Sequence, residues 1–209
     1  MIAGVILAGG RSSRMGVADK CLLPFGGSTI IGHVIATLAP QISRILINSN
    51  SDADKFLPYD LPVRADIVPG YCGPLAGILT GMRWAEEAVP GARHILAVAG
   101  DMPFLPFDLA GKLSAAIGDG DAAIVLSDGR THPTAALWRI GLAARLEQEI
   151  VQNGLRKMHD WLKLLDVSTV EYPASPSLFF NINSQTDLAG AAAFIDVPTR
   201  GHAQNPVPA

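Results

Sequence analysis

The sequence predicts a three-layer α/β sandwich with a mostly parallel central sheet. Short apolar runs typical of buried strands alternate along the chain with segments whose apolar residues recur at helical spacing. Four of these runs end in glycine or in a polar residue, as expected where the carboxyl ends of parallel strands share one ligand-binding edge. The residues that follow or close these four runs are Gly9-Gly10, Asn48, Asp66 and Gly100-Asp101.

The N-terminal half begins with the apolar strand Val5–Ala8, and a short extended piece is predicted at Cys21–Pro24. Ser28 is suited to cap a helix that runs to about Leu38, because its hydroxyl can accept an N–H group of the first turn. The elements predicted next are a strand at Arg44–Asn48, a polar surface connection over residues 52–61, and a short strand at Val63–Val68 that ends near Asp66.

The C-terminal half continues the alternation. Pro74 favours the first turn of a helix that runs to about Val89, and His94–Ala99 is a strongly apolar strand. The later predicted elements are a helix near Phe107–Ile117, a strand at Ala122–Leu126, an antiparallel strand at Thr134–Trp138, amphipathic helices at about Ile140–Val151 and Leu155–Leu164, a strand at Leu165–Tyr172 and a capped helix from Ser184. We expect one domain over residues 1–195 and a disordered tail over residues 196–209, which are rich in Pro, Gly and polar residues.

The composition is that of a single folded domain. The chain has 209 residues, of which 49% are hydrophobic and 17% charged, which is sufficient for one core. The net charge of −3 argues against general affinity for nucleic acid or a membrane surface. The first apolar run is too short for a signal or transmembrane segment. Cys21 and Cys72 are far apart, which is typical of free thiols in a cytoplasmic protein, and the scattered histidines argue against zinc.

The turn after the first strand carries the chemistry of a phosphate-binding loop. Gly9 and Gly10 allow positive φ and a close approach of the backbone to a ligand, and the cations Arg14 and Lys20 follow. Successive backbone N–H groups together with cations suit a polyphosphate. The Walker pattern is excluded, because Gly16 is followed by valine, and the glycines do not have dinucleotide spacing either. For the two glycines alone, a simple glycine-rich turn would remain the better interpretation.

The full string is more specific. Leu7-Ala8-Gly9-Gly10, Ser13-Arg14-Met15-Gly16 and then Asp19-Lys20 resemble the signature of nucleotidyltransferases, which move a nucleoside monophosphate from an NTP. Within that group, residues 2–190 are most similar to the molybdenum cofactor guanylyltransferases, the MobA-like family. The resemblance implies a Rossmann-like nucleotidyltransferase fold and cytoplasmic transfer of GMP from GTP to molybdenum-loaded molybdopterin with Mg²⁺. It also implies transient contact with molybdoenzyme maturation proteins.

The resemblance assigns roles to particular residues. Asp101 is the magnesium ligand, and its position directly after an apolar strand, with Pro103 behind it, agrees with a fixed carboxylate. The implied catalytic residues are Asp101, Lys20 and Arg14. The implied nucleotide-binding residues are Leu7, Ala8, Gly9, Gly10, Lys20, Asn48, Asp66 and Asp101. For Asn48, a strand-end turn residue is an equally good interpretation from the sequence alone, and for Asp66 the alternative is a loop aspartate.

The acceptor side is less defined. Asn181-Ile182-Asn183 resembles a second polar strand end of the family, which suits the metal or the acceptor phosphate. His132 suits contact with the second substrate or a purely structural position, and Arg156 with Lys157 suits an anionic pterin or, preferably, a solvated helix face. The alternatives for function are a molybdopterin cytidylyltransferase, a sugar-phosphate nucleotidyltransferase and a nucleotide sensor without turnover, although Asp101 favours an enzyme.

Overall fold

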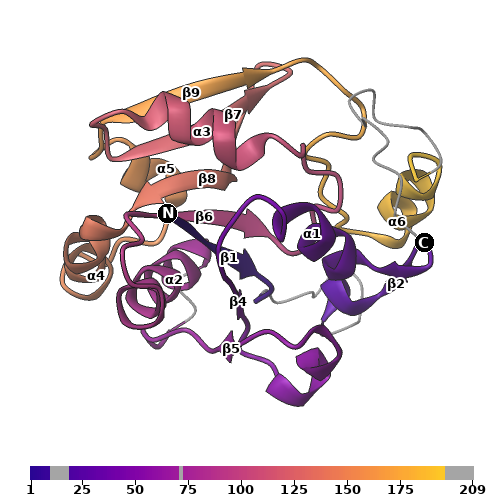
Figure 1. Ribbon diagram of the computed structural model, residues 1–209, viewed down its shortest axis with the longest axis horizontal. Helices are drawn as coiled ribbons and strands as arrows, with labels where there is room; N and C mark the ends of the chain where they lie inside the picture. Colours follow the sequence, from indigo (N-terminus) through magenta and orange to yellow (C-terminus); the bar gives the residue numbers. More distant parts are fainter. Residues whose placement is uncertain (10–18, 71–72, 196–209) are drawn as a thin grey trace.

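A seven-stranded sheet with helices on both faces forms the centre of the protein (Figure 1). The computed structural model describes residues 1–9, 19–70 and 73–195. Across the sheet the strands follow the order β5-β4-β1-β6-β8-β7-β9, and β2 and β3 form a separate hairpin. The strands are β1 (Ile2–Leu7), β2 (Pro24–Phe25), β3 (Ser28–Thr29), β4 (Ile45–Asn48), β5 (Val63–Arg64), β6 (His94–Ala99), β7 (Ala122–Ser127), β8 (Arg130–Arg139) and β9 (Val167–Tyr172).

The sheet is mostly parallel, as predicted. β1 pairs in parallel with β4 and β6, β4 with β5, and β7 with β9, whereas β8 runs antiparallel to β6 and β7. Leu7, the last residue of β1, is in register with Asn48 of β4 on one side and with Ala99 of β6 on the other. The carboxyl ends of these strands therefore meet at one edge of the sheet, where ligands bind in open parallel sheets.

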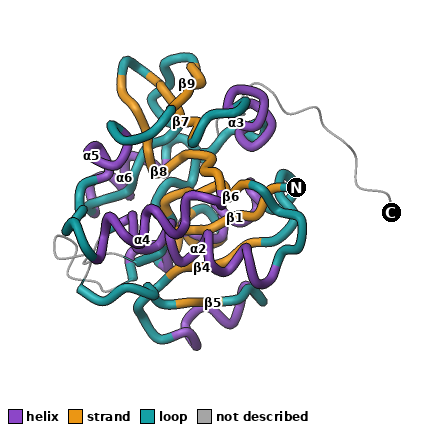
Figure 2. The backbone as a smooth tube through the Cα atoms, turned by 90° about the vertical axis from the view of Figure 1, so that its left-hand side faces the viewer, coloured by secondary structure: helices purple, strands orange, loops and turns teal. Residues whose placement is uncertain are grey.

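Helices cover the two faces of the sheet and make the sandwich three-layered. On one face lie α2 (Pro74–Ala88), α4 (Ala143–Val151) and α5 (Met158–Leu162), with a 3-10 helix η3 (Ile140–Leu142) before α4. Figures 1 and 2 both show α2 beside α4. On the other face lie α1 (Ile30–Leu38), α3 (Leu109–Ile117) and the 3-10 helix η2 (Ala53–Tyr59).

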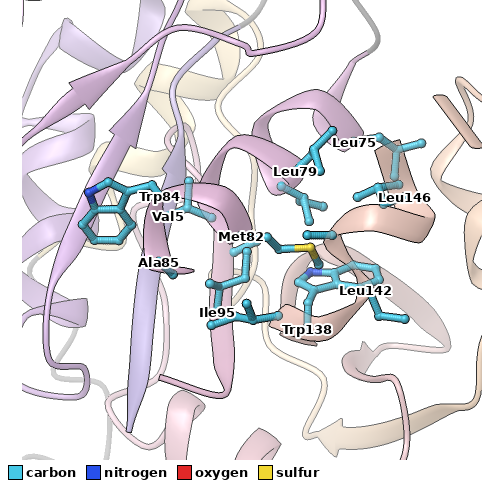
Figure 3. Packing of buried hydrophobic residues seen from close by; sticks show 14 of the residues in the cluster. Val5, Leu75, Leu79, Met82, Trp84, Ala85, Ile95, Trp138, Leu142 and Leu146 are labelled. Carbon is cyan, nitrogen blue, oxygen red and sulfur yellow. The ribbon is translucent and has the colours of Figure 1, made fainter. Parts of the chain in front are cut away.

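A buried apolar core lies between α2 and the sheet. Figure 3 shows Met82 of α2 beside Trp138 of β8, with Leu142 of η3 and Leu146 of α4, from the same layer, close by. Met82, Trp138 and Leu146 are fully buried. Burial of an apolar side chain of this size contributes about 1.5–3 kcal/mol, so these contacts hold α2 and α4 on this face of the sheet.

A smaller apolar cluster closes one end of the molecule. Phe25 of the β2–β3 hairpin and Ile30 of α1 pack with Ile182 and with Ala191 of α6 (Gln185–Ala192). The chain before α6 thereby returns to the first third of the fold. Ser184 caps α6, as predicted, because its side chain accepts a hydrogen bond from the Asp187 N–H.

Several local predictions were wrong. The extended piece expected at Cys21–Pro24 begins instead as a 3-10 helix, η1 (Lys20–Leu22), and only Pro24–Phe25 is a strand. The cap of α1 is Thr29 and not Ser28, because the Thr29 hydroxyl accepts from Gly32 N while Ser28 belongs to β3. Two-residue strands leave no periodicity in a sequence, so the hairpin had no signal beyond its Gly26-Gly27 turn, where both residues have positive φ.

The connection over residues 52–61 is more than a polar surface loop, because η2 buries Phe56 completely. The strand expected at Val63–Val68 is only Val63–Arg64, so Asp66 lies two residues beyond its end. Among the described residues, no helix combines the length and the apolar character that a membrane crossing requires. The predicted tail over residues 196–209 lies outside the described residues.

Candidate functional site

A pocket of about 670 Å³ opens at the carboxyl edge of the sheet. The described residues that line it are Leu7, Ala8, Gly9, Lys20, Cys21, Asn48, Asn50, Ser51, Asp66, Gly73, Pro74, Ala99, Asp101, Thr134, Asn181 and Asn183. Seven residues assigned from the sequence are in that set: Leu7, Ala8, Gly9, Lys20, Asn48, Asp66 and Asp101. The other two, Gly10 and Arg14, lie outside the described residues.

Lys20 and Asp101 meet at the tip of β6. The Lys20 ammonium forms an ion pair with Asp101 Oδ2 and donates a hydrogen bond of 2.7 Å to Asn183 Oδ1. The two side chains are only 21% and 16% exposed, so water screens the pair less than it screens a surface salt bridge. The structure thus brings together residues that are 81 and 163 positions apart in the sequence.

The loop after β6 is held in place by neighbouring backbone. Gly100 donates to the Leu7 carbonyl at 3.0 Å, and a Cβ on Gly100 would lie only 3.3 Å from that same oxygen. Glycine at position 100 therefore allows β6 to end tightly against β1. The Asp101 carbonyl accepts from Ile182 N at 2.9 Å, which places Asn181 and Asn183 on either side of this bond, next to the carboxylate loop.

The segment before Asn181 contains a strained residue. Phe179 has φ of +60° and is 2% exposed, and an aromatic side chain in this left-handed region costs about 1–3 kcal/mol. Its ring packs against His132 and Tyr172, each at a centroid distance of 5.2 Å, and its N–H donates to the Phe104 carbonyl. These contacts fix a conformation that aims the following residues into the pocket.

His132 takes a supporting position within the part of the chain that the structure describes. It stacks on Phe179 and is not among the described lining residues of the pocket. Burial lowers the pKa of its imidazole below 6.5, and Arg130 lowers it further, while a backbone hydrogen bond with Ser127 opposes them. Arg156 also has structural contacts, because its guanidinium donates to the carbonyls of Ile150 in α4 and of Leu155 in the loop that follows α4.

Amides and a carboxylate form the other end of the pocket, near the tips of β4 and β5. Asn48 donates through Nδ2 to Asp66 Oδ1 at 3.0 Å and to the Arg64 carbonyl at 3.2 Å. Asn50 donates to Asp66 Oδ2 at 2.8 Å. A Cβ on Gly77 would lie 2.2 Å from Asn48 Oδ1, so the small residue in α2 is what lets the helix approach this asparagine.

Asp19 anchors the chain just before Lys20. Its carboxylate is 8% exposed and accepts from Ser51 Oγ and, at 2.6 Å, from Lys55 Nζ. Burial alone would raise the pKa of Asp19, but the Lys55 ammonium and the Ser51 hydroxyl hold it below 3.8. The neighbouring Cys21 thiol is a poor nucleophile, because burial, with Asp19 and Asp101 nearby, raises its pKa to about 12.

Three lining residues carried no site assignment from the sequence: Asn50, Ser51 and Thr134. Asn50 had a usable signal, since it lies two residues after Asn48 at the end of a strand. Thr134 had none, because its place in the pocket depends on β8 lying beside β6.

Comparison with known proteins gives one consistent family. A MobA-like NTP transferase domain matches residues 4–167. A molybdenum cofactor guanylyltransferase of Mesorhizobium japonicum is 41% identical over 204 residues, covering 95% of this chain and 98% of that relative. The solved structure of molybdopterin-guanine dinucleotide biosynthesis protein A from Archaeoglobus fulgidus superposes with a TM-score of 0.71 at 26% identity, over 93% of this chain and 98% of that one.

A more distant structure shares the fold. Rv0371C of Mycobacterium tuberculosis, solved in complex with manganese, has a TM-score of 0.67 at 16% identity and covers 92% of this chain and 98% of its own. At this level of identity the likeness extends to the fold alone.

Proposed function

The chain belongs to the MobA-like NTP transferase family, and from that membership we infer that it is a molybdenum cofactor guanylyltransferase. It transfers GMP from GTP to molybdenum-loaded molybdopterin and releases pyrophosphate, which forms the guanine dinucleotide cofactor. The observation that carries this function at the level of the site is the cluster of Lys20, Asp101 and Asn183 at the ligand-binding edge.

The pocket suits a nucleoside triphosphate laid across the strand tips. The cation and carboxylate of Lys20 and Asp101 lie at β6, and the amides of Asn48 and Asn50 with Asp66 lie at β4 and β5. Three strand spacings, about 14 Å in all, separate β6 from β5, so the two ends of the pocket can hold different parts of one elongated ligand. We therefore assign the triphosphate to the Lys20 end and the nucleoside to the Asp66 end.

Magnesium fits the oxygen donors at the Lys20 end. Asn181 Oδ1 is buried and has no hydrogen-bond partner among the described residues, a costly state that a cation would relieve. The described residues contain no group of three or more His, Cys, Asp or Glu side chains that could hold a metal. That agrees with Mg²⁺, which often takes one or two carboxylates plus substrate phosphates. We assign it to Asp101, with Asn181 and Asn183 alongside, where it would act as a Lewis acid on phosphate oxygens.

The residues of the chain act by alignment and by charge. The terminal phosphate of the acceptor is already an anion, so its oxygen attacks the α-phosphorus of GTP without a protein nucleophile. The bond from the α-phosphorus to the bridging oxygen breaks, and pyrophosphate leaves. Holding the two phosphates in line supplies much of the rate enhancement, and Lys20 neutralises charge that develops on the leaving group. Arg14, Gly9 and Gly10 are assigned to the same triphosphate on the family motif.

The proposal also covers the catalytic domain, the cellular compartment and the protein partners. Residues 1–195 form the catalytic domain, and the cysteine usage of the sequence favours the cytoplasm as its compartment. Maturation proteins of the molybdoenzymes are the partners expected to receive the product.

Pyrophosphate release tests the function. The purified protein is mixed with Mg²⁺, GTP and molybdenum-loaded molybdopterin, and each component is left out in turn. Release is expected only in the complete mixture, and replacement of GTP by CTP should reduce it strongly. Faster release with CTP would reassign the protein as a cytidylyltransferase, and binding of GTP without any release would favour the nucleotide sensor.

A further inference from the structure

Asn50 directs its whole side-chain amide at a single residue, Asp66. Its Nδ2 donates to Asp66 Oδ2 at 2.8 Å, and its Oδ1 accepts from the Asp66 N–H at 2.9 Å. The two bonds fix both the backbone and the carboxylate of Asp66, although this residue lies two positions beyond the end of β5. These two bonds restrict the orientation of a side chain that lies in a loop.

The second oxygen of the carboxylate is fixed in the same way. Asp66 Oδ1 accepts from Asn48 Nδ2 at 3.0 Å, so each oxygen takes one amide N–H. A carboxylate oxygen has two acceptor sites, which leaves one on each oxygen of Asp66 for a ligand. Asp66 and Asn50 both line the pocket. The fixed carboxylate thus offers acceptors, and no donors, at the end of the pocket assigned to the nucleoside.

Guanine and cytosine differ in the hydrogen-bond donors that they can present to the Asp66 carboxylate. On its pairing edge, guanine carries two adjacent N–H donors, at N1 and at the exocyclic N2, which match a carboxylate with two bonds. Cytosine carries one donor, at N4, beside acceptors at N3 and O2, whose lone pairs would face the carboxylate. Charge-assisted bidentate pairing favours the first base, and acceptor–acceptor repulsion disfavours the second.

We propose that Asn50 is a positioning residue for base selection, which orients the Asp66 carboxylate so that the pocket accepts guanine and rejects cytosine. The proposal rests on the proposed function, since it takes GTP as the nucleotide donor. Asn50 acts through Asp66. Its loss is therefore expected to change the ratio of affinities for two nucleotides more than it changes stability.

Calorimetry of GTP and CTP binding, with Mg²⁺ and without acceptor, tests this role. Asn50→Ala removes both bonds to Asp66. Asn50→Asp keeps the acceptor for the Asp66 N–H but replaces the donor to Oδ2 by a second carboxylate. Both variants are expected to lower the preference for GTP over CTP at least about tenfold, the size of one good bidentate base contact. Asn153→Ala is the matched control, because that amide donates to a carboxylate, Glu149, outside the described pocket lining.

The possible results distinguish the role of Asn50 from the assignment of the protein as a guanylyltransferase. A folded, GTP-selective wild-type protein whose GTP-to-CTP affinity ratio survives both Asn50 substitutions overturns the role of Asn50 and leaves the guanylyltransferase assignment in place. A wild-type protein that binds CTP as tightly as GTP overturns both. If Asn50→Ala fails to fold, the nearly isosteric Asn50→Asp decides, since it preserves the bond to the backbone.

Discussion

Gly77→Ala probes how closely α2 must approach the nucleoside end of the pocket. The new Cβ would lie 2.2 Å from Asn48 Oδ1 and 2.6 Å from Leu7 Cδ2, well inside van der Waals contact. Asn48 is 3% exposed and cannot swing into solvent without breaking its bonds to Arg64 and Asp66. The substitution therefore moves the amide that we assign to nucleotide binding.

The expected magnitude comes from two opposing effects. Alanine is favoured over glycine inside a helix by about 1 kcal/mol. Overpacking costs about 1–3 kcal/mol, and each weakened hydrogen bond adds about 0.5–1.5 kcal/mol. With the two Asn48 bonds weakened, the net loss of stability is then about 1–5 kcal/mol, which in a chain of this size lowers the melting temperature by about 2–20 °C. GTP binding should weaken as well, because Asn48 and Asp66 shift together.

Gly111→Ala is the matched control, because Gly111 also lies within a helix, α3, and a Cβ there would meet nothing within 4 Å. It should raise stability by about 0.5–1 kcal/mol and leave GTP binding unchanged. Thermal unfolding and calorimetry are run on both variants. If Gly77→Ala were stabilised like the control and bound GTP with wild-type affinity, the close packing of α2 on Asn48 would be refuted as a feature of the site.

Two further predictions concern charge. Lys20→Ala removes the cation shared by Asp101 and Asn183. GTP binding, measured by calorimetry, and turnover should therefore fall, whereas the nucleotide-free protein should bind Mn²⁺ more tightly, as measured by electron paramagnetic resonance. Unchanged binding of GTP and of Mn²⁺ would place Lys20 outside the site. Burial lowers the pKa of His94 and His132 below 6.5, so these groups stabilise the fold above that pH and cease to do so as the pH falls through their lowered pKa values. The melting temperature should therefore fall as the pH is lowered below 6.5, and fall less in the double variant His94→Gln/His132→Gln, whereas carboxylates of lowered pKa such as Asp19 lose their contribution only below pH 3.8. Equal slopes in the two proteins would exclude these histidines as the cause.

Long, strongly patterned elements were predictable from the sequence. The strand His94–Ala99 was predicted with its observed bounds, and the helix from Pro74 ends at Ala88, one residue before the predicted end. Both carry an unambiguous local signal: a continuous apolar run in one and a proline in the first turn of the other. The antiparallel strand was also predicted, although β8 extends beyond Thr134–Trp138 at both ends.

The site could be predicted only in part, because its bonds link distant segments. The ends of parallel strands indicated that Asn48, Asp66 and Asp101 share one edge, and the pocket contains all three. The ion pair of Lys20 with Asp101 and the clamp of Asn50 on Asp66 depend on side-chain orientation in the folded chain, which has no local signature. The capping error at Ser28 has a related cause, since Ser28 and Thr29 are both good caps and tertiary pairing in the hairpin decides between them.

Transfer of the α-phosphate label of GTP to molybdopterin, compared between wild type and Asp101→Asn, tests the proposed chemistry most directly. The substitution keeps the size of the side chain but removes the charge assigned to magnesium, and loss of one such electrostatic group typically costs about 10²–10³ in turnover. The expected variant is folded and still binds GTP, yet it transfers the label that much more slowly and responds weakly to added Mg²⁺. Near-normal transfer with a normal dependence on Mg²⁺ would contradict the assignment of the metal, and with it the proposed mechanism.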